Sequence, residues 1–424
     1  MPGPEPAPID PTEFSQEGFD PQLMRPRKPT AIPRWVSIVG ARPQFIKLAP
    51  LCRAIADLNL QNPTSPIEHQ IIHTGQHYDR DVAGIFFDQM EIPHPNFNLW
   101  VGSGSAGTQI ARMLARMESI LAATHPDWVI IYGDTNSTLA GALLAARLNI
   151  PLAHVESGCR SGQISQPEEQ NRIVADQLSQ VLFSASENDA RNLCREGIGT
   201  PNDPLQRRSV LAGDILFDAL LQNSAIAELR AEEYLHSFPV SSKNFYLLTI
   251  HRPQNTDDPE RLQSICRAAS ALDLPVLFPV HPRTQKILQR GGITLDRNIV
   301  AIQPQGYLEM ITLEKHARII LTDSGGVQKE AFYLRVPCVT LREQTEWTET
   351  VALGANQLVG ASSEKILQAV QSPPSPDWES RHPYGDGTAA KKIVTELAAI
   401  PRRVIIPHNG LASERPMAAA KAAS

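Results

Sequence analysis

The stretch that decides the fold is His316–Tyr333, HARIILTDSGGVQKEAFY. Its short apolar run, Ile319–Leu321, predicts a buried parallel strand, and the residues after Asp-Ser-Gly-Gly favour a helix. The free N–H groups of such a first helical turn attract an anion, and Gly325 and Gly326 leave the backbone open to a phosphate. Glu330, about one and a half turns further on, could reach a hydroxyl of the phosphorylated molecule. The pattern therefore indicates phosphate binding, although a simple tight connection would look the same.

Short apolar runs and helix-favouring segments alternate along the rest of the chain. A helix is predicted over residues 44–58, where apolar side chains recur at helical spacing. Alternating strands and helices indicate parallel sheets, and two successive sets indicate two doubly wound α/β domains, over residues 36–213 and 214–385. The predicted strands are residues 36–39, 69–73, 127–132, 150–155, 245–250, 275–280, 319–321 and 338–341.

Bulk properties agree with two globular domains. At 424 residues the chain is too long for one ordinary domain, and 42% hydrophobic and 20% charged residues are typical of a soluble protein. A formal net charge of -6 gives no reason to expect a nucleic-acid partner. The five cysteines are scattered and never form CxxC, which favours a reducing cytosol without disulfides or a zinc site.

Both ends of the chain differ from its middle. Residues 1–35 contain nine prolines and no apolar core of signal-peptide length, so we expect a disordered or loosely attached leader that directs neither export nor membrane insertion. A flexible tail is expected over residues 401–424. No run approaches the ~20 apolar residues of a membrane span, so no membrane partner is expected.

The predicted turns place polar residues at strand ends, where ligands of doubly wound sheets bind. If the two sheet edges face one another, these residues border one cleft. The cleft contains cations that can hold a diphosphate, such as Lys47, and acids that can transfer protons, such as Glu168. The sequence has no GxGxxG with a trailing acid, no GxxxxGK[ST] and no metal-ligand spacing, which leaves a nucleotide-linked substrate without NAD or metal. The residues that lie just after predicted strands are Arg42, Asp134, Glu156, His251, His281 and Ser324.

Each candidate also has a purely structural interpretation. Asp134 could cap the helix that follows it, and Glu156 could form a buried salt bridge. Glu168 could be a solvated acid in a first helical turn, and His251 and His281 could only hydrogen-bond their turns. Their repeated placement at strand ends favours the functional interpretation for the set.

Seven segments resemble, in order, the signature segments of the non-hydrolysing UDP-N-acetylglucosamine 2-epimerases, from about Val36 to about Ile400. The resemblance implies a GT-B-type architecture, in which two Rossmann-like domains face each other across a cleft and a last helix, over about 386–400, returns to the first domain. The segments are GARPQFIKLAP, TGQHYD, GDTNSTLAGALLAARLNIPLAHVESGCRS, PEEQNRIVADQLSQVLF, TIHRPQNTDD, DSGGVQKEAFYLRVPCVTLREQTEW and HPYGDG.

The resemblance also implies a reaction. The C2 proton of UDP-GlcNAc is removed and UDP leaves C1, giving a bound 2-acetamidoglucal, to which UDP adds back with protonation of the other face. It further implies a cytoplasmic homodimer without a cofactor that supplies precursors of cell-surface polysaccharides. By motif, the catalytic residues are Asp134, Glu156, Glu168 and His251, with base and acid unassigned. The UDP contacts are Arg42, Lys47, His281, Ser324, Gly325, Gly326 and Glu330.

Three departures from the family pattern bear on the substrate. Trp347 replaces the Arg of TERPE, as a stacking wall or as packing for its loop, and Lys329 replaces the penultimate Glu of DSGGxQEE. Asp79 stands where many members have a Gln associated with a second, activating UDP-GlcNAc, so allosteric activation is in question. The sequence Thr-Glu-Trp at residues 345–347 and the segment GARPQFIK at residues 40–47 are more similar to the branch that includes UDP-2,3-diacetamido-2,3-dideoxyglucuronate 2-epimerases.

The sequence therefore predicts a 2-epimerase, with UDP-GlcNAc as the first substrate and the diacetamido-glucuronate as the second. Three other classes remain as alternatives. A GT-B glycosyltransferase would need an acceptor pocket, and a hydrolysing epimerase would release UDP and free ManNAc. A silent sugar-nucleotide sensor is disfavoured because a binding protein has no use for three acids at strand ends.

Overall fold

The computed structural model describes residues 32–76, 87, 89–376, 378 and 382–401. Asp79 and most of the predicted leader and tail lie outside the described residues. The first strand begins at Arg34, inside the segment predicted as leader, because Arg34 pairs with Glu68 and Trp35 is buried. No helix within the described ranges is long and apolar enough to cross a membrane.

The first half of the chain forms a seven-stranded sheet in the order β3-β2-β1-β4-β5-β6-β7, with every neighbouring pair parallel. Its strands are β1 (Arg34–Val39), β2 (Glu68–His73), β3 (Phe97–Asn98), β4 (Trp128–Tyr132), β5 (Leu152–Ser157), β6 (Val181–Ser184) and β7 (Arg208–Leu211). Its helices are α1 (Arg42–Gln61), α3 (Ala106–Thr124), α4 (Asn136–Arg147), α5 (Pro167–Leu178) and α6 (Glu187–Arg195).

The second half forms a six-stranded parallel sheet in the order β10-β9-β8-β11-β12-β13. Its strands are β8 (Tyr246–Thr249), β9 (Val276–Pro279), β10 (Ile299–Ile302), β11 (Ile319–Thr322), β12 (Cys338–Thr340) and β13 (Asn356–Leu358). Its helices are α9 (Pro253–Thr256), α10 (Pro259–Ser270), α11 (Pro282–Arg290), α12 (Tyr307–His316), α13 (Gly325–Tyr333), α14 (Thr348–Ala352) and α15 (Ser363–Gln371).

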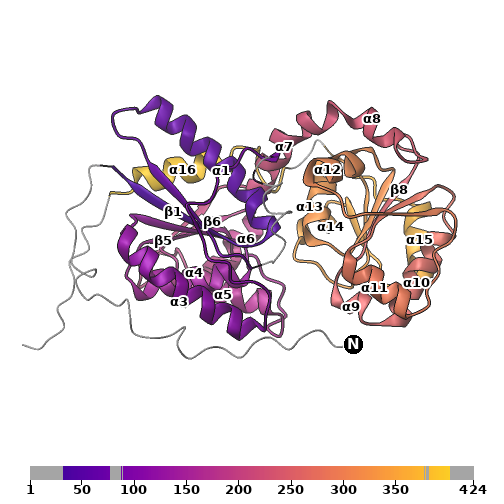
Figure 1. Cartoon of the computed structure of the whole chain (residues 1–424), viewed down its shortest axis with the longest axis horizontal. Helices are drawn as coiled ribbons and strands as arrows, with labels where there is room; N and C mark the ends of the chain where they lie inside the picture. Colours follow the sequence, from indigo (N-terminus) through magenta and orange to yellow (C-terminus); the bar gives the residue numbers. More distant parts are fainter. Residues whose placement is uncertain (1–31, 77–86, 88, 377, 379–381, 402–424) are drawn as a thin grey trace, which may run out of the picture.

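Figure 1 shows the two sheets as separate lobes, with α7 (Ile215–Glu228) and α8 (Ala231–His236) along the top of the view. The last helix, α16 (Ala389–Ala399), lies beside α1 at the other end of the chain. Ile393 and Leu397 of α16 join Leu48 and Leu51 of α1 in one buried cluster. The expected return of the last helix to the first sheet is thus present.

The eight predicted strands and the helix over 44–58 are present, with shifted boundaries. Five further strands, β3, β6, β7, β10 and β13, were not predicted. None is longer than four residues, and β7 has no buried residue, but β6 is the fully buried run VLFS and β10 is the apolar run IVAI, so an apolar signal was available for these two.

The strand order places the site. In each sheet the order reverses once, between β1 and β4 and between β8 and β11, which is the arrangement of dinucleotide-binding sheets. Ligands bind outside the carboxyl ends of strands at such a reversal. The turns after β4, β8 and β11 contain Asp134, His251 and Ser324, and Arg42 is the first residue of the helix after β1.

Candidate functional site

A cavity of about 440 Å³ lies between the carboxyl edges of the two sheets. Every site residue predicted from the sequence lines it, so the expected common cleft is present. From the first sheet these are Arg42, Lys47, Asp134, Glu156 and Glu168, and from the second His251, His281, Ser324, Gly325, Gly326 and Glu330.

The strand-to-helix turn after β11 opens into this cavity. Ser324 is the N-cap of α13 and its hydroxyl makes no capping bond, while its N–H donates to Thr322 Oγ1 at 2.9 Å. A Cβ on Gly325 would lie 3.3 Å from Trp347 Nε1, and one on Gly326 would meet nothing closer than 3.9 Å. Both glycines line the cavity, and the first turn of α13, whose N–H groups suit an anion, therefore borders it without side chains in between.

Glu330 lies on the same helix and is only 8% exposed. Burial raises the pKa of its carboxyl to about 7, against the attraction of the neighbouring Lys329 ammonium. Arg42, at the start of α1 in the other lobe, also attracts this carboxylate. The cavity therefore brings a cation of the first lobe opposite an acid of the second.

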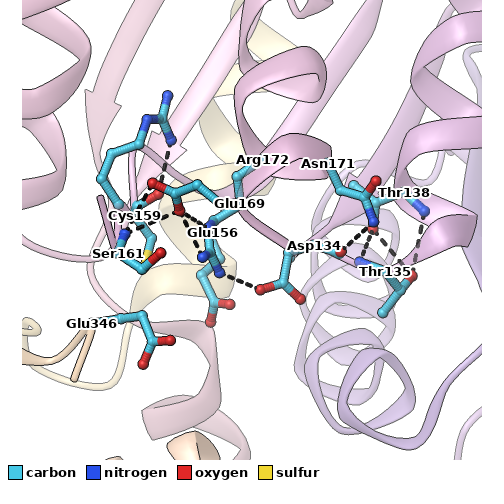
Figure 2. Close-up of polar contacts among 12 residues, drawn as sticks. Asp134, Thr135, Thr138, Glu156, Cys159, Ser161, Glu169, Asn171, Arg172 and Glu346 are labelled. Atoms are coloured by element: carbon cyan, nitrogen blue, oxygen red, sulfur yellow. Dashed lines mark hydrogen bonds and ion pairs between the residues drawn. The ribbon is translucent and has the colours of Figure 1, made fainter. Parts of the chain in front are cut away.

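Asp134 follows β4 and forms an ion pair with Arg172, whose Nη1 is 2.5 Å from Oδ2 (Figure 2). It does not cap α4, because Thr135 is the N-cap. Burial raises the pKa of Asp134, and the Arg172 and Lys47 cations oppose that rise. Arg172 is itself held by Glu169 at 2.7 Å. The helix-capping interpretation of Asp134 is therefore wrong.

Glu156 lies in the bulged end of β5, inside the strand rather than after it, with φ of 70°. It accepts hydrogen bonds from Lys47 Nζ at 2.6 Å and Lys329 Nζ at 3.0 Å. Burial alone would raise its pKa, but the two ammonium groups outweigh burial and lower the pKa to about 2. Glu156 is thus both a buried salt-bridge partner and an ionised carboxylate at the cavity.

The two acids of the PEE motif have different surroundings in the first turn of α5. Glu169 is 2% exposed and accepts hydrogen bonds from Arg172 and from the N–H groups of Ser161 and Gly162. Glu168 is half-buried and lines the cavity. Only the first acid of the pair is therefore placed to meet a substrate.

The two histidines lie after β8 and β9. His251 Nδ1 is 3.3 Å from Asp323 Oδ1, and 43% of its side chain remains exposed. Desolvation lowers the pKa of His251 although Asp323 opposes the shift, which favours the neutral ring. His281 caps α11 and its Nδ1 accepts from the Arg283 N–H at 3.2 Å, so it bonds its own turn while lining the cavity.

Sequence reasoning missed the roles of several cavity residues. Arg172 lies four residues after Glu168 on α5, and this spacing on one helix face was the available signal. Trp347 is 8% exposed and both lines the cavity and packs against Tyr384, so its two proposed roles are not exclusive. The long-range partners of Lys329 left no local signal.

A buried acid outside the cavity predicts a pH effect on stability. Asp189 of α6 is 3% exposed and accepts from the Ser186 N–H at 3.1 Å. Burial, followed by repulsion from Glu349, raises the pKa of Asp189 from 3.8 to about 7. Its contribution to folding is therefore favourable below about pH 4 and is lost as pH rises through about 7.

We expect Asp189→Asn to melt at least ~2 °C higher than the wild type at pH 8, because the amide keeps an acceptor for Ser186 without a buried charge. The difference should shrink toward pH 4. Glu187→Gln, at an exposed position of the same helix, is the matched control. Equal melting curves of Asp189→Asn and wild type at pH 8 would contradict the raised pKa.

The sequence of this chain is similar to those of known proteins. The sequence model of UDP-N-acetylglucosamine 2-epimerase matches residues 60–398. A UDP-N-acetylglucosamine 2-epimerase homolog of Methanococcus maripaludis is 47% identical over 85% of this chain and 98% of its own length. A UDP-2,3-diacetamido-2,3-dideoxy-D-glucuronate 2-epimerase of Pseudomonas aeruginosa is 41% identical over 86% and 99%.

Solved structures show the same relationship. The Methanocaldococcus jannaschii UDP-GlcNAc 2-epimerase in complex with UDP-GlcNAc and UDP has a TM-score of 0.77 and 40% identity, over 86% of this chain and 99% of that one. This likeness includes the GT-B-type pair of Rossmann-like lobes. The chain belongs to the UDP-N-acetylglucosamine 2-epimerase family.

Proposed function

We propose that this protein is a non-hydrolysing 2-epimerase that interconverts UDP-GlcNAc and UDP-ManNAc. The observation that carries the proposal is the shared cavity, in which an anion-binding turn at Ser324 faces the acids Asp134, Glu156 and Glu168. A site that only binds a nucleotide would need the anion-binding turn but not the three acids. Acids opposite the diphosphate supply the proton transfers that epimerisation requires.

In this proposal the turn after β11 binds the diphosphate. Its glycines and the first-turn N–H groups of α13 contact the phosphate oxygens, and Arg42 adds a cation from the opposite lobe. The Glu330 carboxylate accepts a hydrogen bond from a hydroxyl of the ribose. His281 caps the neighbouring α11 at the same edge and completes the nucleotide contacts.

The chemistry follows from two carboxyl groups whose pKa values are shifted in opposite directions. Breaking the C1–O bond sends its electron pair to the β-phosphate of UDP, and positive charge develops at the sugar. The ionised Glu156 stabilises that charge. Asp134, with its raised pKa, takes the C2 proton as the C1=C2 double bond forms.

In the return reaction the retained UDP adds back to C1, and C2 is protonated on the face opposite to the one that lost its proton, so no atom is lost or gained. We assign the second proton transfer to Glu168, which lines the cavity from α5 rather than from a strand end. The diphosphate anion favours the protonated ring of His251, whose Nδ1–H faces Asp323 and whose Nε2–H donates to the leaving diphosphate oxygens.

Incubation with UDP-GlcNAc in deuterated water tests the proposal. Deuterium at C2 of a sugar that still carries UDP, in both epimers, is the expected result. Free UDP together with free sugar would indicate a hydrolysing epimerase. No exchange at all would leave a glycosyltransferase, a sensor or a different sugar.

A second candidate substrate is UDP-2,3-diacetamido-2,3-dideoxyglucuronate. The similarity to the Pseudomonas aeruginosa enzyme, at 41% identity, supports it nearly as well as 42% identity to the UDP-N-acetylglucosamine 2-epimerase of Methanocaldococcus jannaschii supports UDP-GlcNAc. Repeating the deuterium experiment with both sugars side by side, and comparing kcat/KM, decides between them.

Replacement of Glu330 tests the ribose contact. Glu330→Ala is expected to weaken UDP binding about 3- to 10-fold, the effect of losing one hydrogen bond worth ~0.5–1.5 kcal/mol. Glu330→Gln keeps an acceptor and should lose less. Calorimetric titration with UDP measures both, and unchanged affinity in Glu330→Ala would remove this residue from the site.

The proposal extends to a homodimer in the cytoplasm that supplies precursors of cell-surface polysaccharides. The family resemblance supports the dimer and the pathway. The five cysteines, all free and four of them buried, support a reducing compartment. Sedimentation equilibrium of the full chain tests the dimer.

A further inference from the structure

Lys329 is a lysine whose ammonium group is enclosed. It is 1% exposed, and its Nζ lies 3.0 Å from Glu156 Oε2 and 2.7 Å from Asp214 Oδ2. The same ammonium lies 3.9 Å from the centre of the Trp347 ring, a cation–π contact. Lys329 therefore joins the proposed catalytic acid Glu156 to the tryptophan at the edge of the cavity.

Both partners of this contact depart from the motifs of the family. In the segments that this chain resembles, an acid is common where Lys329 stands and an arginine is usual where Trp347 stands. Because the two side chains touch, the departures form one physical change rather than two. The positive member of the pair now lies on α13 instead of the loop before α14.

Each half of this change would be unfavourable alone. A glutamate at position 329 would face Glu156 and Asp214, so three carboxylates would meet in a buried space. An arginine at position 347 would bring a second cation against the Lys329 ammonium where an aromatic face now receives it. Among the residues that the structure describes, Lys47, on the other oxygen of Glu156, is the one cation that would still pair with that acid if Lys329 were lost.

We propose that Lys329 is a positioning residue that orients Glu156 and keeps it ionised, and that Trp347 is the coupled substitution that accommodates its charge. Asp214 fixes the ammonium from its other side, and Tyr333 donates a hydrogen bond to Asp214. Lys329 thus couples the helix that carries the anion-binding turn to the acid of the opposite sheet. The catalytic part of the inference rests on the proposed function, whereas the coupling of the two side chains does not.

A double-mutant cycle tests the coupling by stability alone. Lys329→Glu and Trp347→Arg are each expected to lower Tm, and the double variant, which restores both motif residues, is expected to melt above Lys329→Glu. Lys286→Glu, with the same change of charge at an exposed position of α11, is the control. A double variant whose loss equals the sum of the single losses would overturn the coupling.

Kinetics test the positioning role in Lys329→Met. We expect kcat to fall about 10²-fold, the effect of misplacing a reacting group, with little change in the affinity for UDP. Loss of the Lys329 cation should raise the pKa of Glu156. The acidic limb of the plot of kcat against pH should therefore move up by about one pH unit or more. Unchanged kcat and an unmoved limb would overturn the positioning role. If the wild type shows no epimerisation, the proposed function fails, and the Tm cycle still decides the coupling.

Discussion

Asp134→Asn is expected to lower kcat by about 10²- to 10⁴-fold, the contribution of one general acid–base group, while UDP still binds. The amide is nearly isosteric and still accepts a hydrogen bond from Arg172, which lies 2.5 Å from the native carboxylate. The amide cannot take a proton, however, because the substitution removes the Asp134 carboxylate, whose pKa is raised by burial. Coupled assay of both epimers and calorimetry with UDP measure the two effects separately.

The matched control uses the other end of the same strand. Asp127 accepts the N–H of Arg34 at 2.8 Å just before β4, so Asp127→Asn makes the same chemical change at the edge that faces away from the cavity. It should leave kcat and KM unchanged. If Asp134→Asn kept wild-type turnover and deuterium exchange at C2, the proton transfer would have to be assigned to another residue.

The fold was largely predictable because its central strands are buried on both faces. The run Trp128–Tyr132 is buried throughout, and such runs stand out from the amphipathic helices between them. By contrast, β13 is the tripeptide Asn356–Leu358 with a single apolar residue, and it pairs with β12 as a strand. Its conformation depends on residues distant in sequence, and no local pattern contains that information.

The site was predictable for a related reason. A residue that directly follows a strand must lie at a sheet edge, so positions such as Asp134 and His251 could be grouped without knowing any distance. Ion pairs across the cleft had no such signal. Lys329 and Glu156 are 173 residues apart, and only the packing of the two lobes brings them to 3.0 Å. The difference between Glu168 and Glu169 depends on the loop before α5, because the N–H groups of Ser161 and Gly162 bind Glu169.

The anion-binding turn makes the other large prediction. A methyl group on Gly326 would meet no atom closer than 3.9 Å, so the fold tolerates Gly326→Ala. The methyl would instead fill the space through which a phosphate reaches the first-turn N–H groups of α13. Loss of one charge-assisted hydrogen bond, worth ~1.5–3 kcal/mol, should weaken UDP binding by about 10- to 100-fold.

The control for this substitution is Gly107→Ala, because an added Cβ there also meets no neighbour and α3 lies outside the cavity. Both variants should keep the wild-type Tm, whereas only Gly326→Ala should lose affinity for UDP in calorimetric titration. Uridine lacks the diphosphate, so its weaker binding should be the same in both variants. Equal losses for UDP and uridine in Gly326→Ala would mean that the turn contacts the nucleoside, and the diphosphate would then have to bind at the Arg42 side of the cavity.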